Sequence, residues 1–339
     1  MTGQIMKRFR AGIDNYGLFP LQLTPIATLE WALARGAEGV SFSGLAPEDD
    51  AATDDRALDA ISAFARDHGL YLEWGGAQHV PRDLTTWAPK DIGAVNRRAR
   101  AQAVRLGATV VRSCSGGMMR WHDDSPPTET LLRETSAALR QQASEWRDTG
   151  TTLAIETHFE FTSHELLRLF AMCGASPGGW LGVCLDTMNL LTMLEDPVEA
   201  TRRLLPWVVS THIKDGGIRL DPDGLHSFPV GIGHGAIDLA AILVLLGTLD
   251  RGVHLSVEDH AGDFLLPIFD PVFLAKFPDL TVGEFARLMA LAARTSSRPS
   301  ANPLPRECWA EVAETRMASD VAALRALARD FATPPSDRP

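Results

Sequence analysis

The sequence has few cysteines, no long apolar run and no excess of positive charge. Its four cysteines among 339 residues are scattered, with no C-x-x-C pair, as is typical of proteins of the reducing cytosol. No apolar stretch reaches the roughly 18 residues that span a bilayer. The basic start M-T-G-Q-I-M-K-R-F-R is not followed by the apolar segment of a secretory signal. We therefore expect a cytoplasmic protein without a membrane partner.

Several functional motifs are also missing. The net charge of −11 argues against a nucleic-acid partner, because binding a phosphate backbone favours a basic surface. There is no P-loop and no G-x-S-x-G turn, and the D-N-Y-G-L-F-P that follows the first expected strand is not a glycine-rich phosphate turn. The sequence therefore gives no support to a nucleotide-binding protein or a serine hydrolase of the common folds.

What is present is a regular alternation of strand and helix patterns. The hydrophobic content of 45% and the charged content of 22% are those of a globular protein with a large core. Eight short apolar and β-branched runs are expected to form strands. They are Arg10–Asp14, Val40–Ser43, Leu70–Trp74, Thr109–Ser113, Thr152–Thr157, Leu181–Asp186, 208–212 and Val253–Glu258. Each is followed by an amphipathic segment of helical period.

Eight such units predict an α/β protein, a closed (β/α)8 TIM barrel over residues 1–295. A doubly wound open sheet is the alternative fold. Residues 296–339 form a C-terminal extension, a Pro- and Ser-rich linker followed by a helix from about Trp309 to Phe331. We expect this helix to pack on the barrel or on a neighbouring subunit.

Four consecutive strands of the predicted barrel end in polar residues. The last residues of strands five to eight are Glu156, Asp186, His212 and Glu258. Alternation along each strand makes the residues two positions earlier share the inward face, and these are small. Because catalytic residues of TIM barrels lie where strands end, we expect the four to meet at the mouth.

Three carboxylates beside one imidazole repel one another unless a cation lies among them. Three oxygen donors and one nitrogen suit one divalent ion, Mn²⁺ above all, with Mg²⁺, Co²⁺ or Zn²⁺ as alternatives. The opposing interpretation is that four unrelated polar residues end four strands. Their common register on consecutive strands favours a metal site formed by these four residues.

The motifs around these residues resemble a known family. E-T-H-F on strand five, C-L-D-T-M-N on six, T-H-I-K-D on seven and S-V-E-D-H on eight are similar to the xylose isomerase-like TIM barrels, as is the G-I-G-H-G-A-I-D-L segment. That superfamily includes sugar isomerases, ketose 3-epimerases, dehydratases and apurinic endonucleases. The resemblance implies that Glu156, Asp186, His212 and Glu258 bind one metal, and that Glu156 and Glu258 move the proton in an epimerase.

Two departures narrow this resemblance. Asn189 stands where the epimerases and endonucleases carry a histidine, three residues after the strand-six aspartate. After strand four the chain has Arg112, Ser113 and Cys114, and no histidine until His122. Both the missing histidine and the acidic charge argue against a trinuclear endonuclease.

We therefore expect a metal-dependent sugar isomerase or epimerase. Glu156 or Glu258 would remove the proton next to a substrate carbonyl, giving a metal-stabilised enediolate. Expulsion of a β-substituent from the same enediolate would make the enzyme a lyase or dehydratase on a keto-sugar or inosose, which is the alternative. A barrel that only binds carbohydrate is a third hypothesis.

Further residues near strand ends are candidates for contacts with a carbohydrate or polyol substrate. They are His158, Lys214, Arg112, Trp74 and His260, and each also has a structural interpretation as a salt bridge, a solvated side chain or packing. The apolar loop A-G-D-F-L-L-P-I-F-D-P-V-F-L-A-K-F after strand eight predicts a lid or a subunit contact. We favour a contact in a homo-oligomer that also borders the mouth.

Overall fold

The computed structural model describes residues 9–45, 49, 53–295 and 302–332, and a closed barrel of eight parallel strands forms its centre. In chain order the strands are β1 (Arg10–Asp14), β2 (Gly39–Phe42), β3 (Tyr71–Ala77), β4 (Val110–Ser113), β5 (Thr152–Glu156), β6 (Leu181–Asp186), β7 (Val208–Ile213) and β10 (His254–Val257). The first strand, β1, pairs with both β2 and β10, so the sheet closes. This closure confirms the predicted (β/α)8 barrel and excludes the open sheet.

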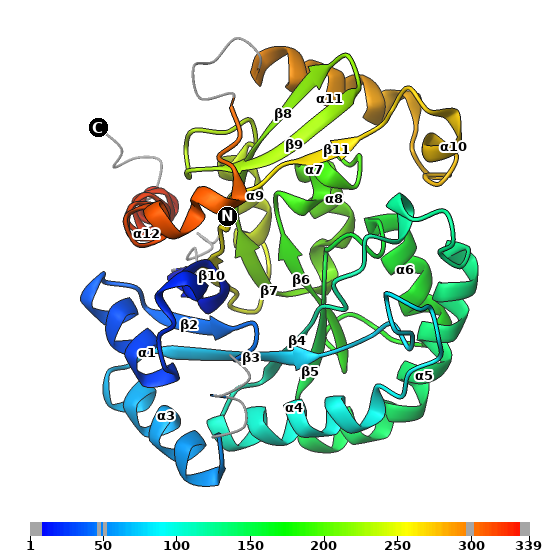
Figure 1. Ribbon diagram of the computed structural model, residues 1–339. Coiled ribbons are helices and arrows are strands. Elements are labelled where there is room, and N and C mark those ends of the chain that lie inside the picture. The colour runs from blue at the N-terminus through cyan, green and yellow to red at the C-terminus, as the bar shows by residue number, and fades with distance from the viewer. Residues whose placement is uncertain (1–8, 46–48, 50–52, 296–301, 333–339) are drawn as a thin grey trace, which may run out of the picture.

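Helices surround the barrel (Figure 1). They are α1 (Pro25–Ala34), α3 (Asp55–Asp67), α4 (Gly93–Leu106), α5 (Thr128–Thr149), α6 (Ser163–Met172), α8 (Pro197–Leu204), α9 (Leu239–Gly247) and α11 (Val282–Thr295). Local sequence fixes their ends. Asp54 accepts a hydrogen bond from the Ala57 amide at the start of α3, and Thr162 with Glu165 forms a capping box at the start of α6. Gly150 adopts a left-handed conformation and ends α5.

A small antiparallel sheet stands beside the barrel mouth, where the sequence predicted loops. It consists of β8 (Asp215–Asp221), β9 (Gly224–Val230) and β11 (Phe264–Leu266), in the order β11-β9-β8. The segments after β7 and β10 are therefore partly ordered as strands, and α11 packs against β8. Two short helices, α7 (Asn189–Thr192) and α10 (Pro271–Leu274), complete this region.

The apolar segment after β10 is largely buried against its own chain. Leu266, Ile268 and Phe273 are each at most 5% exposed, whereas Phe269 and Val272 are more than 60% exposed. Pairing of β11 with β9 explains much of the burial. An oligomer contact stays a prediction, and within the described segment the exposed pair is the part that a partner would cover.

The C-terminal helix α12 (Trp309–Ala332) packs on the barrel beside the N-terminal elements (Figure 1). It contacts β1, β10 and the 3-10 segment η1 (Asn15–Leu21). Trp309 is 1% exposed, and its indole nitrogen donates a hydrogen bond of 3.0 Å to the Gly17 carbonyl. Much of the expected linker, 296–301, lies outside the described residues. Across the described ranges the helices are too short or too polar to cross a membrane.

Candidate functional site

The four strand-end residues meet inside the barrel mouth. One ligand atom from each of Glu156, Asp186, His212 and Glu258, here called the central cluster, lies within 4.8 Å of the others. Their strands β5, β6, β7 and β10 are neighbours in the barrel, which is why the side chains converge. All four side chains are buried, Asp186 and His212 completely. The structure therefore brings together the residues that the sequence predicted to share a site.

Asp186 is held by the chain immediately after it. Its Oδ1 accepts hydrogen bonds of 3.0 Å from the amides of Met188 and Asn189, which leaves Oδ2 directed at the cluster. Asn189, which stands where the resemblance calls for histidine, thus contributes its backbone. Its side-chain Nδ2 is buried and makes no hydrogen bond to the residues that the structure describes.

His212 bridges the two sides of the cluster. Its Nδ1 lies 3.4 Å from Glu156 Oε1 and 3.3 Å from Glu258 Oε2, and its Nε2 lies 3.2 Å from Asp14 Oδ2. Asp14 ends β1 and is itself fixed by the Ser43 hydroxyl at 2.6 Å. Asp14 was not among the site residues predicted from the sequence. The signal was present, because Asp14 is a polar residue at the end of a barrel strand like the other four.

Two buried cations neutralise the carboxylates. The ammonium of Lys214 lies 2.6 Å from Glu258 Oε2 and 3.0 Å from Asp186 Oδ2. Arg112 donates a hydrogen bond to Glu156 and another, of 3.0 Å, to the Ser43 carbonyl. Lys214 therefore pairs with the cluster rather than with Asp215, whose carboxylate accepts amide hydrogen bonds from Gly216, Gly233 and Gly235.

Burial and charge set the ionisation of the cluster. Burial alone would raise the pKa of Glu156 and of Glu258, but Arg112 beside the first, Lys214 beside the second and His212 beside both lower each pKa below its ordinary value. Burial raises the pKa of Asp186 to about 6 despite Lys214. Burial would lower the pKa of His212, but Cys184 and the surrounding carboxylates hold it well above its ordinary value. The two glutamates are thus the most strongly ionised members.

The cluster is suited to a divalent ion. Within the described chain, Asp186 Oδ2, His212 Nδ1 and Glu258 Oε2 are buried without a partner in hydrogen-bond geometry, although Lys214 is near two of them. Buried polar atoms usually make hydrogen bonds, so three that meet at one point, two of them held only by the charge of Lys214, are suited to bind a further cation. Carboxylate oxygens with one imidazole match the donors that Mn²⁺ and similar ions prefer. The donor set and these unpaired atoms fit a metal.

A pocket of about 570 Å³ opens beside the cluster. It is lined by residues that follow β1, β2 and β4, among them Asn15, Tyr16, Ser43, Cys114 and Ser115, and by Arg112 of β4 itself. Arg112 lines the pocket and contacts Glu156, so it connects the pocket with the central cluster. A larger cavity of about 690 Å³ beside Arg82 and Lys90 is lined neither by the cluster residues nor by Arg112, so it lies apart from the site.

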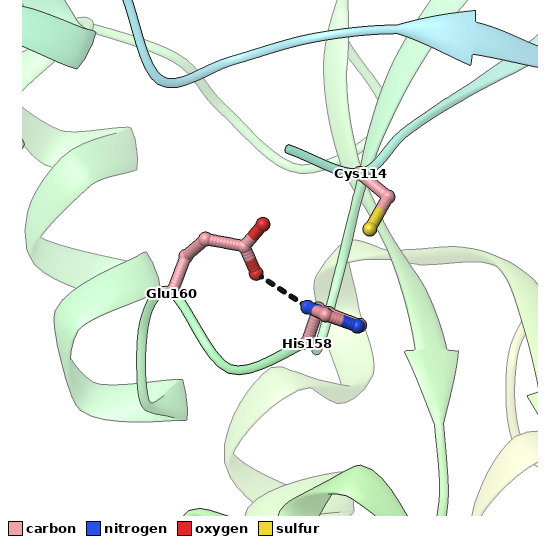
Figure 2. A group of neighbouring side chains, drawn as sticks. All are labelled: Cys114, His158 and Glu160. Carbon is pink, nitrogen blue, oxygen red and sulfur yellow. Dashed lines mark hydrogen bonds and ion pairs between the residues drawn. The ribbon is translucent and has the colours of Figure 1, made fainter. Parts of the chain in front are cut away.

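The remaining predicted contacts divide into three groups. His260 is buried beside Lys214, with its Nε2 3.4 Å from the ammonium, so it borders the cluster. His158 lies instead 2.9 Å from Glu160 Oε2 and near Cys114 (Figure 2). Trp74 is not at the mouth, and this prediction was wrong. Its indole donates to Gln102 on α4, because Tyr71 and Glu73 occupy the inward positions of β3.

Comparison with known proteins agrees with this geometry. The chain is 28% identical over 219 residues to the uncharacterized protein YihM of Escherichia coli K12, a match that covers 64% of this chain and 60% of that protein. It is 27% identical over 208 residues to the 3-oxo-isoapionate decarboxylase of Pectobacterium atrosepticum, covering 59% of this chain and 66% of that protein. The chain thus spans less than two thirds of each relative.

Among solved structures, an L-ribulose 3-epimerase has a similar fold, with a TM-score of 0.60, 18% identity and coverage of 96% of both chains. The sequence profile described as xylose isomerase-like TIM barrel matches residues 29–272. This match covers the barrel from α1 to α10 and includes all four residues of the central cluster. With its closed barrel and its strand-end residues, the chain belongs to the xylose isomerase-like TIM barrel family.

Proposed function

We propose that this chain is a divalent-metal-dependent enzyme that isomerises or epimerises a small sugar. The observation that carries this proposal is the placement of Glu156 and Glu258, which lie 3.4 Å and 3.3 Å from one nitrogen of His212. Two ionised carboxylates therefore converge on one imidazole nitrogen. The adjoining pocket of about 570 Å³ falls in the usual size range for small-molecule sites.

The two glutamates act as the proton-transferring groups. One carboxylate removes the proton from the carbon next to the substrate carbonyl, and the electron pair of that bond moves to the carbonyl oxygen to give an enediolate. The other glutamate, once protonated from solvent, donates its proton to the opposite face of the enediolate to give the epimer, and the first glutamate then releases the proton it took to solvent. Return of the first proton to the neighbouring carbon, with the hydroxyl proton passing to the former carbonyl oxygen, gives the isomer. A divalent ion held by the central cluster would supply Lewis-acid polarisation of the substrate oxygens.

Arg112 and Lys214 assist by position. Both side chains are buried and both contact a catalytic glutamate. Their charged N–H groups stabilise the negative charge that develops on substrate oxygens in a site largely closed to water. His260 and Asp14 are positioning residues, which orient Lys214 and His212 respectively.

The second candidate is a lyase acting on a keto-sugar or a keto-sugar acid. The two buried cations favour it, because Arg112 and Lys214 suit a substrate carboxylate. The relative from Pectobacterium is named a decarboxylase, which supports this class. Loss of carbon dioxide leaves the electron pair of the broken C–C bond on the carbonyl oxygen, whereas elimination of a β-hydroxyl starts from the enediolate. The intact cluster argues against a barrel that only binds carbohydrate.

The test is NMR spectroscopy of the Mn²⁺-loaded enzyme with a panel of ketoses, keto-sugar acids and inososes in deuterated water, with the paramagnetic ion removed by chelation before spectra are recorded. Deuterium gained at a carbon next to the carbonyl, with the carbon skeleton kept, supports the isomerase or epimerase. Release of carbon dioxide or of water selects the lyase. If no compound in the panel exchanges or reacts with any of the four candidate metals, the proposed activity is wrong.

A further inference from the structure

A second group of metal-competent side chains lies at the barrel mouth, separate from the central cluster. Cys114 follows β4, and His158 and Glu160 follow β5; we call these three residues the thiol cluster. One ligand atom from each lies within 4.8 Å of the others. Figure 2 shows the sulfur, the imidazole and the carboxylate directed toward one another from the two loops. No residue is shared between the two clusters.

The thiol cluster is held in place by its own contacts. Glu160 Oε2 lies 2.9 Å from His158 Nδ1, and Glu160 Oε1 accepts hydrogen bonds from the amides of Gly116 and Gly117 at 2.6 Å and 3.2 Å. The Glu160 side chain is 1% exposed and that of His158 is 18% exposed. The arrangement ties the loop after β4 to the loop after β5, so the three donors are positioned before any ligand arrives.

We propose that Cys114, His158 and Glu160 form a second metal site, of the type that binds Zn²⁺. A thiolate, an imidazole and a carboxylate are the donors that tetrahedral zinc uses, and a soft sulfur ligand disfavours Mg²⁺ and Mn²⁺. The central cluster has the opposite preference, because most of its donors are oxygens. The two sites are therefore expected to select different ions.

The distances allow this geometry with small movements. Two nitrogen or oxygen ligands about 2.0 Å from a tetrahedral zinc lie about 3.3 Å apart, so Glu160 Oε2 and His158 Nδ1, now at 2.9 Å, would separate slightly. The sulfur already lies within 4.8 Å of both other ligand atoms. Cys114 and His158 are partly exposed, so rotation of their side chains can adjust these distances.

The site is accessible to a fourth ligand. Cys114 lines the 570 Å³ pocket together with Arg112, which contacts Glu156 of the central cluster. Three protein ligands with one open position are typical of zinc that meets a water or a substrate. A sugar oxygen or carboxylate in this pocket thus has access to the second ion as well as to Arg112.

Cobalt is the probe, because a thiolate bound to Co²⁺ gives an intense near-ultraviolet charge-transfer band. Metal-free full-length protein titrated with Co²⁺ should develop this band. Cys114→Ser should abolish it, and Cys308→Ser should keep it, since Cys308 is another partly exposed cysteine outside the cluster. Zn²⁺ uptake, measured by competition with a coloured chelator, should fall by one equivalent in Cys114→Ser. Circular dichroism checks that each variant is folded.

Two further variants separate this proposal from the proposed function. Glu258→Gln should weaken Mn²⁺ retention at the central cluster and leave the cobalt band unchanged. Glu160→Gln, which keeps an oxygen acceptor for the Gly116 amide, should weaken Zn²⁺ affinity, because the amide lacks the negative charge of the carboxylate ligand. Absence of a band in the wild-type protein, or a band that persists in Cys114→Ser and disappears in Cys184→Ser, would overturn the second site. Neither result would affect the proposed reaction.

Discussion

Lys214 places its ammonium 2.6 Å from Glu258 Oε2, at an oxygen that the central cluster would also offer to a metal. The same nitrogen lies 3.0 Å from Asp186 Oδ2. In the metal-free chain Lys214 thus supplies part of the positive charge that three buried carboxylates need. A divalent ion would share these two oxygens with the ammonium, so the lysine and the metal compete.

Lys214→Met tests this competition. Removing the ammonium leaves buried carboxylates without their partner, so the metal-free variant should lose about 3 kcal/mol of stability. Mn²⁺ should then raise the melting temperature more in the variant than in the wild type, because ligand binding to the folded state stabilises it. Thermal unfolding with and without Mn²⁺ measures both effects. Lys276→Met, which removes an ion pair with Asp123, is the control. An equal Mn²⁺ shift in wild type and Lys214→Met would contradict the competition.

Glu258→Gln tests the assignment of the second glutamate. The amide cannot accept the proton, so we expect kcat to fall about 10²–10⁴-fold for the isomerase or epimerase. Retention of Mn²⁺ should also weaken, as judged by the metal content after gel filtration. Glu199→Gln on α8, whose side chain is 39% exposed, is the matched control. Full turnover by Glu258→Gln would refute its catalytic role.

Asp320 on α12 gives a pH-dependent prediction. Burial raises its pKa to about 6, above the ordinary value of 3.8. The folded state therefore binds the proton more tightly than the unfolded state. The stability that this proton contributes is present below about pH 4 and is lost as the pH rises through about 6.

Asp320→Asn should remove this dependence. Relative to the wild type, the variant should gain up to about 3 kcal/mol between about pH 4 and pH 7.5. Urea unfolding of both proteins at the two pH values gives the difference. Asp67→Asn, with a side chain 67% exposed, should show no comparable gain. A constant difference between wild type and Asp320→Asn at both pH values would show that Asp320 does not titrate in this way.

A substitution at Gly235 tests how closely this loop packs against Asp215 and Gly216 of β8. A Cβ at this position would lie 2.0 Å from Asp215 Oδ1 and 2.6 Å from the Gly216 carbonyl oxygen. Gly235→Ala should therefore destabilise the protein by about 2–3 kcal/mol in urea unfolding. At Gly252 a Cβ would meet no described atom within 4 Å, so Gly252→Ala should change stability much less. Equal effects of the two substitutions would mean that the loop adjusts freely.

Most of the barrel and its central cluster were predictable from sequence. The first strand, Arg10–Asp14, has the bounds that were expected, and the C-terminal helix expected from about Trp309 to Phe331 ends one residue later. Strand ends and alternation were sufficient to choose Glu156, Asp186, His212 and Glu258. These signals are local: a period, a cap or a stop at glycine. They were sufficient to predict a shared site because the closed barrel brings the ends of neighbouring strands together.

Contacts between distant segments were not predictable in the same way. Trp74 was chosen for its place near a strand end, but its parity directs it to α4. Lys214 was a candidate for a substrate contact or a salt bridge, but the sequence could not name its partners, which are Asp186 and Glu258 from other strands. The β8–β9 hairpin was taken for a loop, since Gly216, Gly217 and Pro229 weaken a strand pattern that only pairing restores.

The packing of α12 against the segment after β1 affects how the protein folds during synthesis. The Trp309 indole bonds to Gly17, 292 positions earlier, and Arg306 donates to the hydroxyl of Tyr16, which lines the pocket. Because a ribosome synthesises the chain from its N-terminus, the pocket segment that contains Tyr16 and Gly17 is made early. It gains its contacts with α12 only when synthesis of the chain is nearly complete. A nascent barrel lacking its final helix would therefore be a folding intermediate with an unfinished substrate pocket.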